Sequence, residues 1–420
     1  MLEQVLLWFK NDPKLLEKVS IPITCAFVGW LTNWVAVEMI FRPLEFIGFW
    51  KIGWKGIIPN HALKMSGMIT DILTKKLMTP KELYSRIDPK VMSEEVKDLI
   101  DAKSGEIVQE IILGQNPQLW NILPDVVKKN IQEQVKNEIP NQIIEIYKNY
   151  GNDLDSVLEF DQIVKESLSG KNVLVLIELF KRCGGPEFRF IIVSGIYFGF
   201  IIGLIQLAFL SILGQWWTFP IMGVVVGYLT NWLALQMIFL PLEEKNFILF
   251  KYQGLFLRRQ DEVSKELGNI LAQKVLNEEN LLRLIFKGKG GDLIIKLVMD
   301  SANKSVEKLM KEKAPLMPTL LGSEKTNKIK EVVAEKILSM IPQIASRLQN
   351  YITTSLKIEE TVSTRLSKLS KAQFEDILHS VFKEDEMTLI ILGAFLGGLV
   401  GLIQAALVID PSQLPQFLRF

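Results

Sequence analysis

The sequence predicts an all-α membrane protein made of two parallel repeats, each with a transmembrane helix, an amphipathic helical insert and a second transmembrane helix. Three observations lead to this fold class. Four stretches are long and apolar enough to cross a bilayer, which requires about 20 residues. A motif in the first half of the chain returns in the second half, 198 residues further on. The segments between the apolar stretches have apolar residues at three-and-four spacing, as amphipathic helices do.

Composition limits the function classes. The 420 residues are 49% hydrophobic and 23% charged, with a mean hydropathy of +0.23, so apolar residues must be concentrated in particular segments. A formal net charge of +1 provides no basic field for nucleic acid, and we expect no nucleic-acid partner. Two cysteines and two histidines are too few for a zinc cluster. We therefore expect reduced thiols, no metal site and no cofactor.

Repeat 1 is predicted over residues 21–213, after an N-terminal amphipathic stretch at 1–20. Its transmembrane helices are expected at 21–41 and 190–213, and its helical insert at 44–187. No small-residue cleavage site follows the first apolar stretch, so we do not interpret it as a signal peptide.

Repeat 2 is predicted over residues 219–409, with transmembrane helices at 219–240 and 387–409. Its insert is expected at 242–386, and a short tail follows at 410–420.

The duplication is visible in the letters of the sequence. GWLTNWVAVEMIFRPLE at 29–45 returns as GYLTNWLALQMIFLPLE at 227–243, and GLIQ at 203–206 returns at 401–404. The same shift of 198 residues relates both matches. A match of this length at a fixed period indicates an internal repeat.

Both inserts are predicted to be helical, with one apolar stripe each. In the second insert the stripe passes through seven residues: Ile329, Val333, Ile337, Ile341, Ile344, Leu348 and Ile352. Pro140 and Pro342 are expected to kink or break their helices. Helix starts are expected at Thr79-Pro80, Asp88-Pro89 and Ser323-Glu324. The stripes require a cover, which is either partner helices or a bound apolar ligand.

Aromatic and basic residues alternate just after the first transmembrane helix of each repeat. FIGFWKIGWKGII at 46–58 and NFILFKYQGLFLRR at 246–259 favour interfacial collars over short strands, because the aromatic pattern occurs in both repeats.

Basic residues predict the orientation. Each repeat crosses twice, so both inserts lie on one side, where lysine and arginine crowd the ends of the spans. The positive-inside rule places the inserts in the cytoplasm and the termini outside, with Trp216 and Trp217 at the outer interface.

Glycines recur at every fourth residue in the second transmembrane helix of each repeat: Gly195, Gly199, Gly203, Gly393, Gly397 and Gly401. This spacing leaves a groove that another backbone can approach closely. Gln206 and Gln404 follow near the same face. A glutamine amide in hydrocarbon requires a hydrogen-bond partner, so we expect each to bond across the helix contact.

The first transmembrane helix of each repeat carries a polar pair, Thr32-Asn33 and Thr230-Asn231. In the favoured interpretation, the asparagines bond between repeats, to Gln206 and Gln404. The alternative is a polar path or a re-entrant turn, as in transporters built from repeats.

Glu38 and Arg42 are four residues apart, the spacing of a helical ion pair. Their counterparts, Gln236 and Leu240, lack both charges. Because both charges are lost together, we predict that Arg42 neutralises Glu38 and that Glu38 does not act as a proton carrier.

Two linked motifs resemble a known family. A Gly-x-x-Thr-Asn helix ends in Phe-Arg-Pro, and a Gly-x-Ile-Pro turn precedes a helix that closes in Thr-Pro. These positions are Gly29, Thr32, Asn33, Phe41, Arg42, Pro43, Gly56, Ile58, Pro59, Thr79 and Pro80. The pattern resembles bacterial membrane proteins of domain-of-unknown-function family 445, also called uncharacterised membrane-protein family 0754. The resemblance implies a multi-pass protein of the bacterial inner membrane and supplies no activity.

The second repeat departs from that pattern. Leu240 replaces the arginine, Leu257 the turn proline, and Asn277-Glu278 the Thr-Pro. Basic residues after the turn are present as Arg258 and Arg259 in repeat 2, where repeat 1 has Asn60 and His61. A role that needs those residues is therefore held by one repeat or divided between the two.

No phosphate-binding loop, zinc-protease or serine-hydrolase motif occurs. The GKGG at 288–291 is expected to be a loop before a helix at Asp292, and His379 an exposed helix residue without a paired acid. We therefore expect no catalytic residues and no enzyme. The leading hypothesis is a membrane-anchored scaffold that binds the bilayer and a protein partner or itself. The alternative is a lipid-handling protein or carrier, with its site between the repeats or in the inserts.

Overall fold

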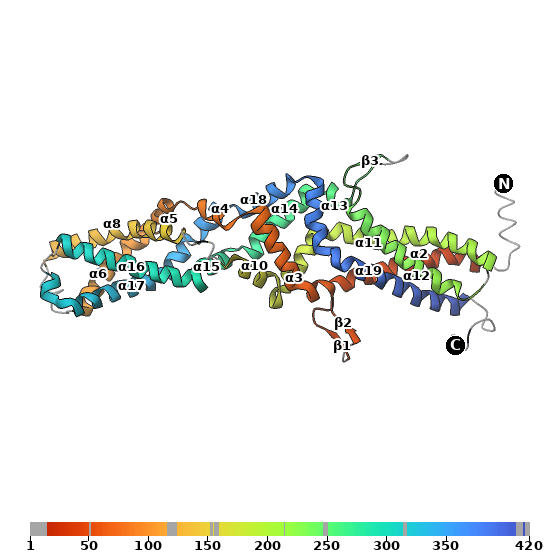
Figure 1. The fold of residues 1–420 in the computed structure, drawn as a ribbon, viewed down its shortest axis with the longest axis horizontal. Helices are drawn as coiled ribbons and strands as arrows, with labels where there is room; N and C mark the ends of the chain where they lie inside the picture. The colour runs from red at the N-terminus through yellow and green to blue at the C-terminus, as the bar shows by residue number, and fades with distance from the viewer. Residues whose placement is uncertain are drawn as a thin grey trace. The chain divides into compact units, whose positions relative to one another are not determined.

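The computed structural model describes residues 15–49, 52–115, 124–151, 154, 159–213, 215–246, 251–313, 317–408 and 415. Most of the N-terminal stretch at 1–20 and nearly all of the tail at 410–420 lie outside these residues. Within them the chain is helical except for two short hairpins, so the all-α class is confirmed (Figure 1).

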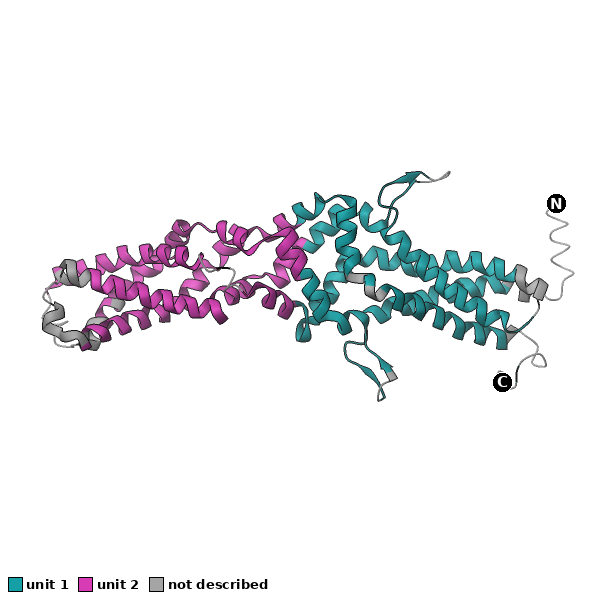
Figure 2. Cartoon of the chain, in the orientation of Figure 1, with its two compact units in different colours: residues 1–69, 168–267, 363–420 teal, residues 70–167, 268–362 magenta. Residues whose placement is uncertain are grey.

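Residues group by contact into two compact units (Figure 2). Unit 1 contains residues 1–69, 168–267 and 363–420, and unit 2 contains 70–167 and 268–362. Unit 2 therefore combines a segment from each of the two predicted inserts. The physical reason is that each insert has one apolar stripe, and helices of the two inserts pack together with apolar side chains between them.

Four helices of unit 1 are long and apolar enough to cross a membrane. They are α2 (Leu15–Phe41), α11 (Val173–Leu213), α12 (Thr218–Phe239) and α19 (Lys371–Val408). They pack as a bundle in which α2 lies along α11 and α12 lies along α19. The second span of each repeat is part of a longer helix, because α11 has 41 residues and α19 has 38. The expected starts at 190 and 387 are therefore not helix ends.

Large apolar side chains on all four helices point away from the bundle. Phe27, Tyr197, Ile221 and Phe395 are more than half exposed. An exposed apolar surface of this kind on long apolar helices is the surface that a bilayer covers.

The segments expected as interfacial collars form short hairpins, the disfavoured alternative, and their place at the membrane interface remains a prediction. β1 (Ile47–Phe49) pairs antiparallel with β2 (Ile52–Trp54), and β3 (Lys245–Asn246) pairs with β4 (Lys251–Tyr252). The alternation of aromatic and basic residues is the period of a strand, and that period decided the local structure.

The remaining helices of unit 1 connect the spans to the inserts. They are α3 (Ile57–Asp71), α13 (Leu255–Arg258) and α14 (Gln260–Ile270), with the 3₁₀ turn η3 (Gly170–Asn172) before α11. α18 (Ile358–Ser367) lies at the boundary between the units.

Unit 2 is built from helices of both inserts. The first insert supplies η1 (Ile72–Leu77), α4 (Pro80–Ser85), α5 (Pro89–Glu95), α6 (Lys97–Gln115), α8 (Asp125–Tyr150) and α10 (Phe160–Leu168). The second supplies η4 (Leu271–Val275), α15 (Glu278–Phe286), α16 (Gly288–Lys313) and α17 (Met317–Leu356).

Side-chain caps explain several of these starts. Thr79 accepts a hydrogen bond from the Glu82 amide at 3.2 Å, and Asp88 accepts one from the Lys90 amide at 2.8 Å. Asn277, which replaces the family's threonine in repeat 2, caps α15 in the same way at 2.9 Å.

Two local expectations about the inserts are wrong. The helix expected to start at Ser323-Glu324 already runs from Met317, and the GKGG segment is the start of α16. Pro140 and Pro342 lie inside α8 and α17 and do not break these helices; a kink at either proline remains a prediction.

Candidate functional site

The two asparagines of the membrane helices bond within their own repeats. Asn33 Nδ2 donates to the Ile191 carbonyl at 2.7 Å, and Asn231 Nδ2 donates to the Leu389 carbonyl at 2.8 Å. Each bond joins the first span of a repeat to the second, and both asparagines are buried. The expected asparagine–glutamine bonds are therefore wrong: these amides find helix carbonyls close by.

The threonines beside them differ between the repeats. Thr230 Oγ1 donates to Asn33 Oδ1 at 3.4 Å, so this pair does link the repeats. Thr32 Oγ1 bonds to the carbonyl of Val28 in its own helix at 2.9 Å. Among the residues that the structure describes, the Asn231 side-chain oxygen accepts no hydrogen bond.

The glutamines bond at the opposite end of the bundle. Cys25 Sγ donates to Gln206 Oε1 at 3.0 Å within repeat 1. Gln404 Nε2 donates to Thr24 Oγ1 at 2.8 Å, which links repeat 2 to repeat 1. Both glutamines are buried.

The six glycines of the second spans lie against the backbone of the first spans. A Cβ at Gly195 would lie 2.3 Å from the Gly29 carbonyl oxygen, and one at Gly393 would lie 2.7 Å from that of Gly227. Corresponding distances are 2.4 Å at Gly199, 2.1 Å at Gly397 and 2.5 Å at Gly401, each to a carbonyl oxygen, and 2.7 Å at Gly203 to the Pro22 Cα. No side chain fits at these contacts, so the helices approach as closely as their backbones permit.

The Glu38–Arg42 ion pair forms, with Arg42 Nε 3.4 Å from Glu38 Oε1. The two side chains are 46% and 71% exposed in the bundle, respectively. A single exposed pair of this kind contributes little to stability.

Sequence reasoning missed a buried ion pair near the ends of the spans that lead into the inserts. Glu187 is 1% exposed, and both its oxygens accept from Arg259 Nη1, at 2.6 and 2.7 Å. Arg259 also donates to Glu262, and its hydrogen bonds to Glu262 and then to Glu187 raise the pKa of Arg259. Arg259 is therefore committed to an internal ion pair that joins repeat 2 to repeat 1.

His379 also differs from its expected exposed position. Its Nδ1 lies 2.7 Å from Glu375 Oε1 and its Nε2 lies 3.2 Å from Glu386 Oε2. Its ring stacks on Phe239 at 4.6 Å. In repeat 1 the positions 198 residues earlier hold Lys181 over the Phe41 ring, at 4.8 Å. Both repeats thus place a basic side chain on the last phenylalanine of the first span.

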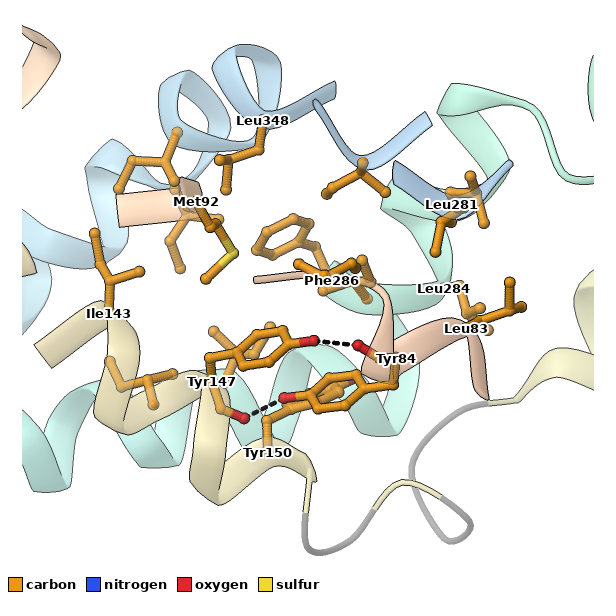
Figure 3. Close-up of a pocket in the computed structure, with 18 of the residues that line it drawn as sticks. Leu83, Tyr84, Met92, Ile143, Tyr147, Tyr150, Leu281, Leu284, Phe286 and Leu348 are labelled. Carbon is orange, nitrogen blue, oxygen red and sulfur yellow. Dashed lines mark hydrogen bonds between the residues drawn. The ribbon is translucent and has the colours of Figure 1, made fainter. Parts of the chain in front are cut away.

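Unit 2 contains an apolar cavity of about 170 Å³ (Figure 3). It is lined by side chains from α4, α5, α8, α10, α15, α16 and α17, so both inserts contribute. From α17 the lining residues are Ile337, Ile341, Ile344, Leu348, Ile352 and Leu356. Most of the apolar stripe predicted for the second insert therefore faces an open space.

Three tyrosines lie at one side of this cavity. Tyr84 and Tyr147 stack at 4.2 Å and bond reciprocally: each hydroxyl donates to the other's backbone carbonyl (Figure 3). Tyr150 is 4% exposed, and its hydroxyl has no hydrogen-bond partner among the described residues. Burial raises the pKa of Tyr150 to about 12, so the phenol is protonated at neutral pH.

A second, polar hollow of about 140 Å³ lies on the other side of Leu284, which lines both spaces. Its charged lining residues are Glu159, Glu166, Arg283 and Lys287. Arg283 Nη2 lies 2.9 Å from Glu166 Oε2, and Lys289 Nζ lies 3.8 Å from Glu159 Oε1. Hydrogen bonds from Gln162 and then Arg283 hold the pKa of Glu166 below its usual value.

Comparisons with known proteins confirm the resemblance seen in the sequence. Residues 23–153 match the family described as protein of unknown function DUF445. A UPF0754 membrane protein of Nostoc sp. is 23% identical over 444 residues, covering 94% of this chain and 96% of the relative. Those of Microcystis aeruginosa and Trichodesmium erythraeum are 23% and 24% identical and cover 95% and 92% of this chain, and 98% and 97% of themselves. No solved structure matches.

Proposed function

From this relationship to bacterial membrane proteins over nearly the whole chain, we propose that the protein is a membrane-anchored lipid-binding protein. Its four spans hold it in the bilayer, and the cavity of unit 2 receives an acyl chain. The observation that carries this proposal is the cavity itself, whose lining is almost entirely hydrocarbon. Its volume exceeds that of the 150 Å³ apolar cavities known to stay dry and bind benzene.

The form of the lining favours a chain over a compact ring. The α17 residues that line the cavity extend from Ile337 to Leu356. At the helical rise of 1.5 Å per residue, this is roughly 28 Å of helix surface. A long, narrow aliphatic surface matches an extended hydrocarbon, and the bilayer that surrounds the spans is the natural source of one.

The scaffold hypothesis and the absence of enzymatic activity remain predictions. A unit that acts only as a scaffold gains stability when its core is filled, because protein interiors pack like crystals. An unfilled cavity costs about 24 cal/mol per Å³. Retention of this space is better accounted for by a ligand that occupies it.

Photo-labelling tests the proposal. Full-length protein in detergent is irradiated with palmitate that carries a mid-chain diazirine, and labelled peptides are identified by mass spectrometry. We expect labels on 281–298 and 337–356. Ile294→Phe, in the cavity wall, should reduce labelling at least fivefold. Its neighbour Ile295 is 45% exposed, so Ile295→Phe is the matched control. Equal labelling of both variants, or labels confined to the spans, would contradict the proposal.

We also infer that the chain sits in the bacterial inner membrane with its inserts in the cytoplasm. The support is the set of basic residues at the insert side of the spans, including Arg182, Arg258 and Arg259. Cys25 and Cys183 are both buried and give little background. Trp217→Cys should therefore react with a membrane-impermeant maleimide from outside the inner membrane. Reaction only after that membrane is opened would invert the orientation.

A further inference from the structure

The apolar cavity has one polar group that the protein leaves unused, the hydroxyl of Tyr150. Only 4% of this residue is exposed, and no described residue bonds to the hydroxyl. Buried polar groups nearly always have a partner, because one that has lost water without replacing it is costly. An unpartnered donor in the wall of a cavity is accounted for by a ligand that supplies the acceptor.

This hydroxyl lies beside the first turn of α16. A Cβ at position 290 would lie 2.6 Å from it, so Gly290 gives the hydroxyl its room. The amides of a first helical turn have no partners within the helix and carry partial positive charge. An oxygen acceptor that reaches Tyr150 therefore meets a favourable field.

The polar hollow begins at the same turn. Gly288, two residues before Gly290, lines it, and Leu284 forms part of both walls. A Cβ at position 288 would lie 2.6 Å from Glu159 Oε2. The end of the cavity and the start of the hollow are therefore adjacent.

The hollow is lined by two carboxylates and two basic side chains, and one of the basic side chains has no carboxylate partner among the described residues. Glu166 is paired with Arg283 and Glu159 with Lys289. Within the described part of the chain, Lys287 has no carboxylate within 4.0 Å. Arginine and lysine at such a position hold phosphate through charge-assisted hydrogen bonds.

We propose that the bound lipid is a glycerophosphate ester, with its chain in the apolar cavity, its ester carbonyl at Tyr150 and its phosphate at Arg283 and Lys287. The Tyr150 hydroxyl, which has no protein partner among the described residues, donates a hydrogen bond to this carbonyl oxygen. This inference rests on the proposed function and adds the chemical class of the ligand.

The test uses three competitors in the photo-labelling experiment on the full-length protein. They are monooleoylglycerol phosphate, monooleoylglycerol and 1-octadecene, which have the same chain length. The second lacks the phosphate of the first, and the third lacks the ester as well. We expect wild-type protein to rank them in that order. Tyr150→Phe should weaken the two esters about three- to tenfold, the range of one hydrogen bond, and leave octadecene unchanged.

The variant Arg283→Gln/Lys287→Gln should weaken only the phosphate ester. Lys304→Gln removes an exposed ion pair of α16 with Glu145 outside both spaces and should change nothing. Thermal unfolding shows whether each variant is folded, and Tyr150→Phe should be no less stable than wild type without ligand. Three equal competitors, or esters unaffected by Tyr150→Phe, would overturn this inference and leave the proposed function in place. Failure of all three to compete would contradict both.

Discussion

The membrane bundle of unit 1 and the core of unit 2 solve the same packing problem in opposite ways. In the bundle, glycines bring backbones so close that a single added carbon would lie 2.1–2.7 Å from the neighbouring helix. In unit 2, isoleucines and leucines surround a cavity of about 170 Å³. Both regions are helical, and each is built from segments of both halves of the chain.

The difference follows from the solvent of each region. Between membrane helices there is little hydrophobic drive, so close backbone contact and hydrogen bonds must provide the association. In water, large aliphatic side chains provide enough drive to hold helices around incompletely filled space. The comparison teaches that this chain combines a tightly packed membrane bundle with a helical unit that encloses open apolar space.

The largest expected effect is on the stability of the closely packed membrane bundle. Gly199→Leu and Gly397→Leu should each destabilise the bundle by about 3 kcal/mol or more, because the obstructing atoms are backbone carbonyls that cannot turn aside. Gly185→Leu, in the same helix as Gly199, is the control, since no atom lies within 4 Å of its added carbon. Thermal unfolding in detergent measures all three, and equal melting temperatures would remove the distinction between the membrane bundle and unit 2.

The next effect concerns the open side and alkaline pH. The folded pKa of Tyr150, about 12, lies above the ordinary phenol value of about 10. The contribution of the protonated Tyr150 to the free energy of unfolding is therefore fully present below pH 10. It is lost as pH rises from 10 through 12, which lowers that free energy by about 2–3 kcal/mol. Unfolding followed by circular dichroism from pH 8 to 12 should show this decline.

Tyr150→Phe should reduce that alkaline decline. Tyr197→Phe should not, because Tyr197 is 65% exposed. An identical pH dependence in both variants would show that the cavity wall admits water freely.

The smallest effect distinguishes the two repeats inside the bundle. Asn33→Leu and Asn231→Leu each remove one interhelical bond and should cost about 1–2 kcal/mol. Asn33→Leu should cost about 0.5–1 kcal/mol more, because Asn33 also accepts from Thr230. Thr230→Val should reproduce that difference in melting experiments. Equal costs would mean that the repeats are not joined at this bond.

Much of the fold could be predicted because its signals are local. A run of apolar residues sets a span, and Thr79 or Asp88 before a proline sets a helix start. The strand period of the residues after each first span was also present, but the chemistry of its side chains suggested a different interpretation.

The candidate site could be predicted only in part. The α17 stripe was visible, and its unknown cover was left open between helices and a ligand. The cavity forms where residues from seven helices meet. The periodicity of apolar residues within one helix does not predict the distance between that helix and its neighbours. The Glu187 ion pair was missed and His379 was misplaced for the same reason: their partners Arg259 and Phe239 are distant in sequence.

The interleaving of unit 2 has a consequence for biosynthesis. Residues 70–167 leave the ribosome before their partners at 268–362 exist. At bacterial rates of about 5–20 residues per second, the nascent chain waits roughly ten to forty seconds with an apolar stripe uncovered. During that interval the apolar residues of the first segment cannot be buried against the second, which is the kind of exposure that favours aggregation.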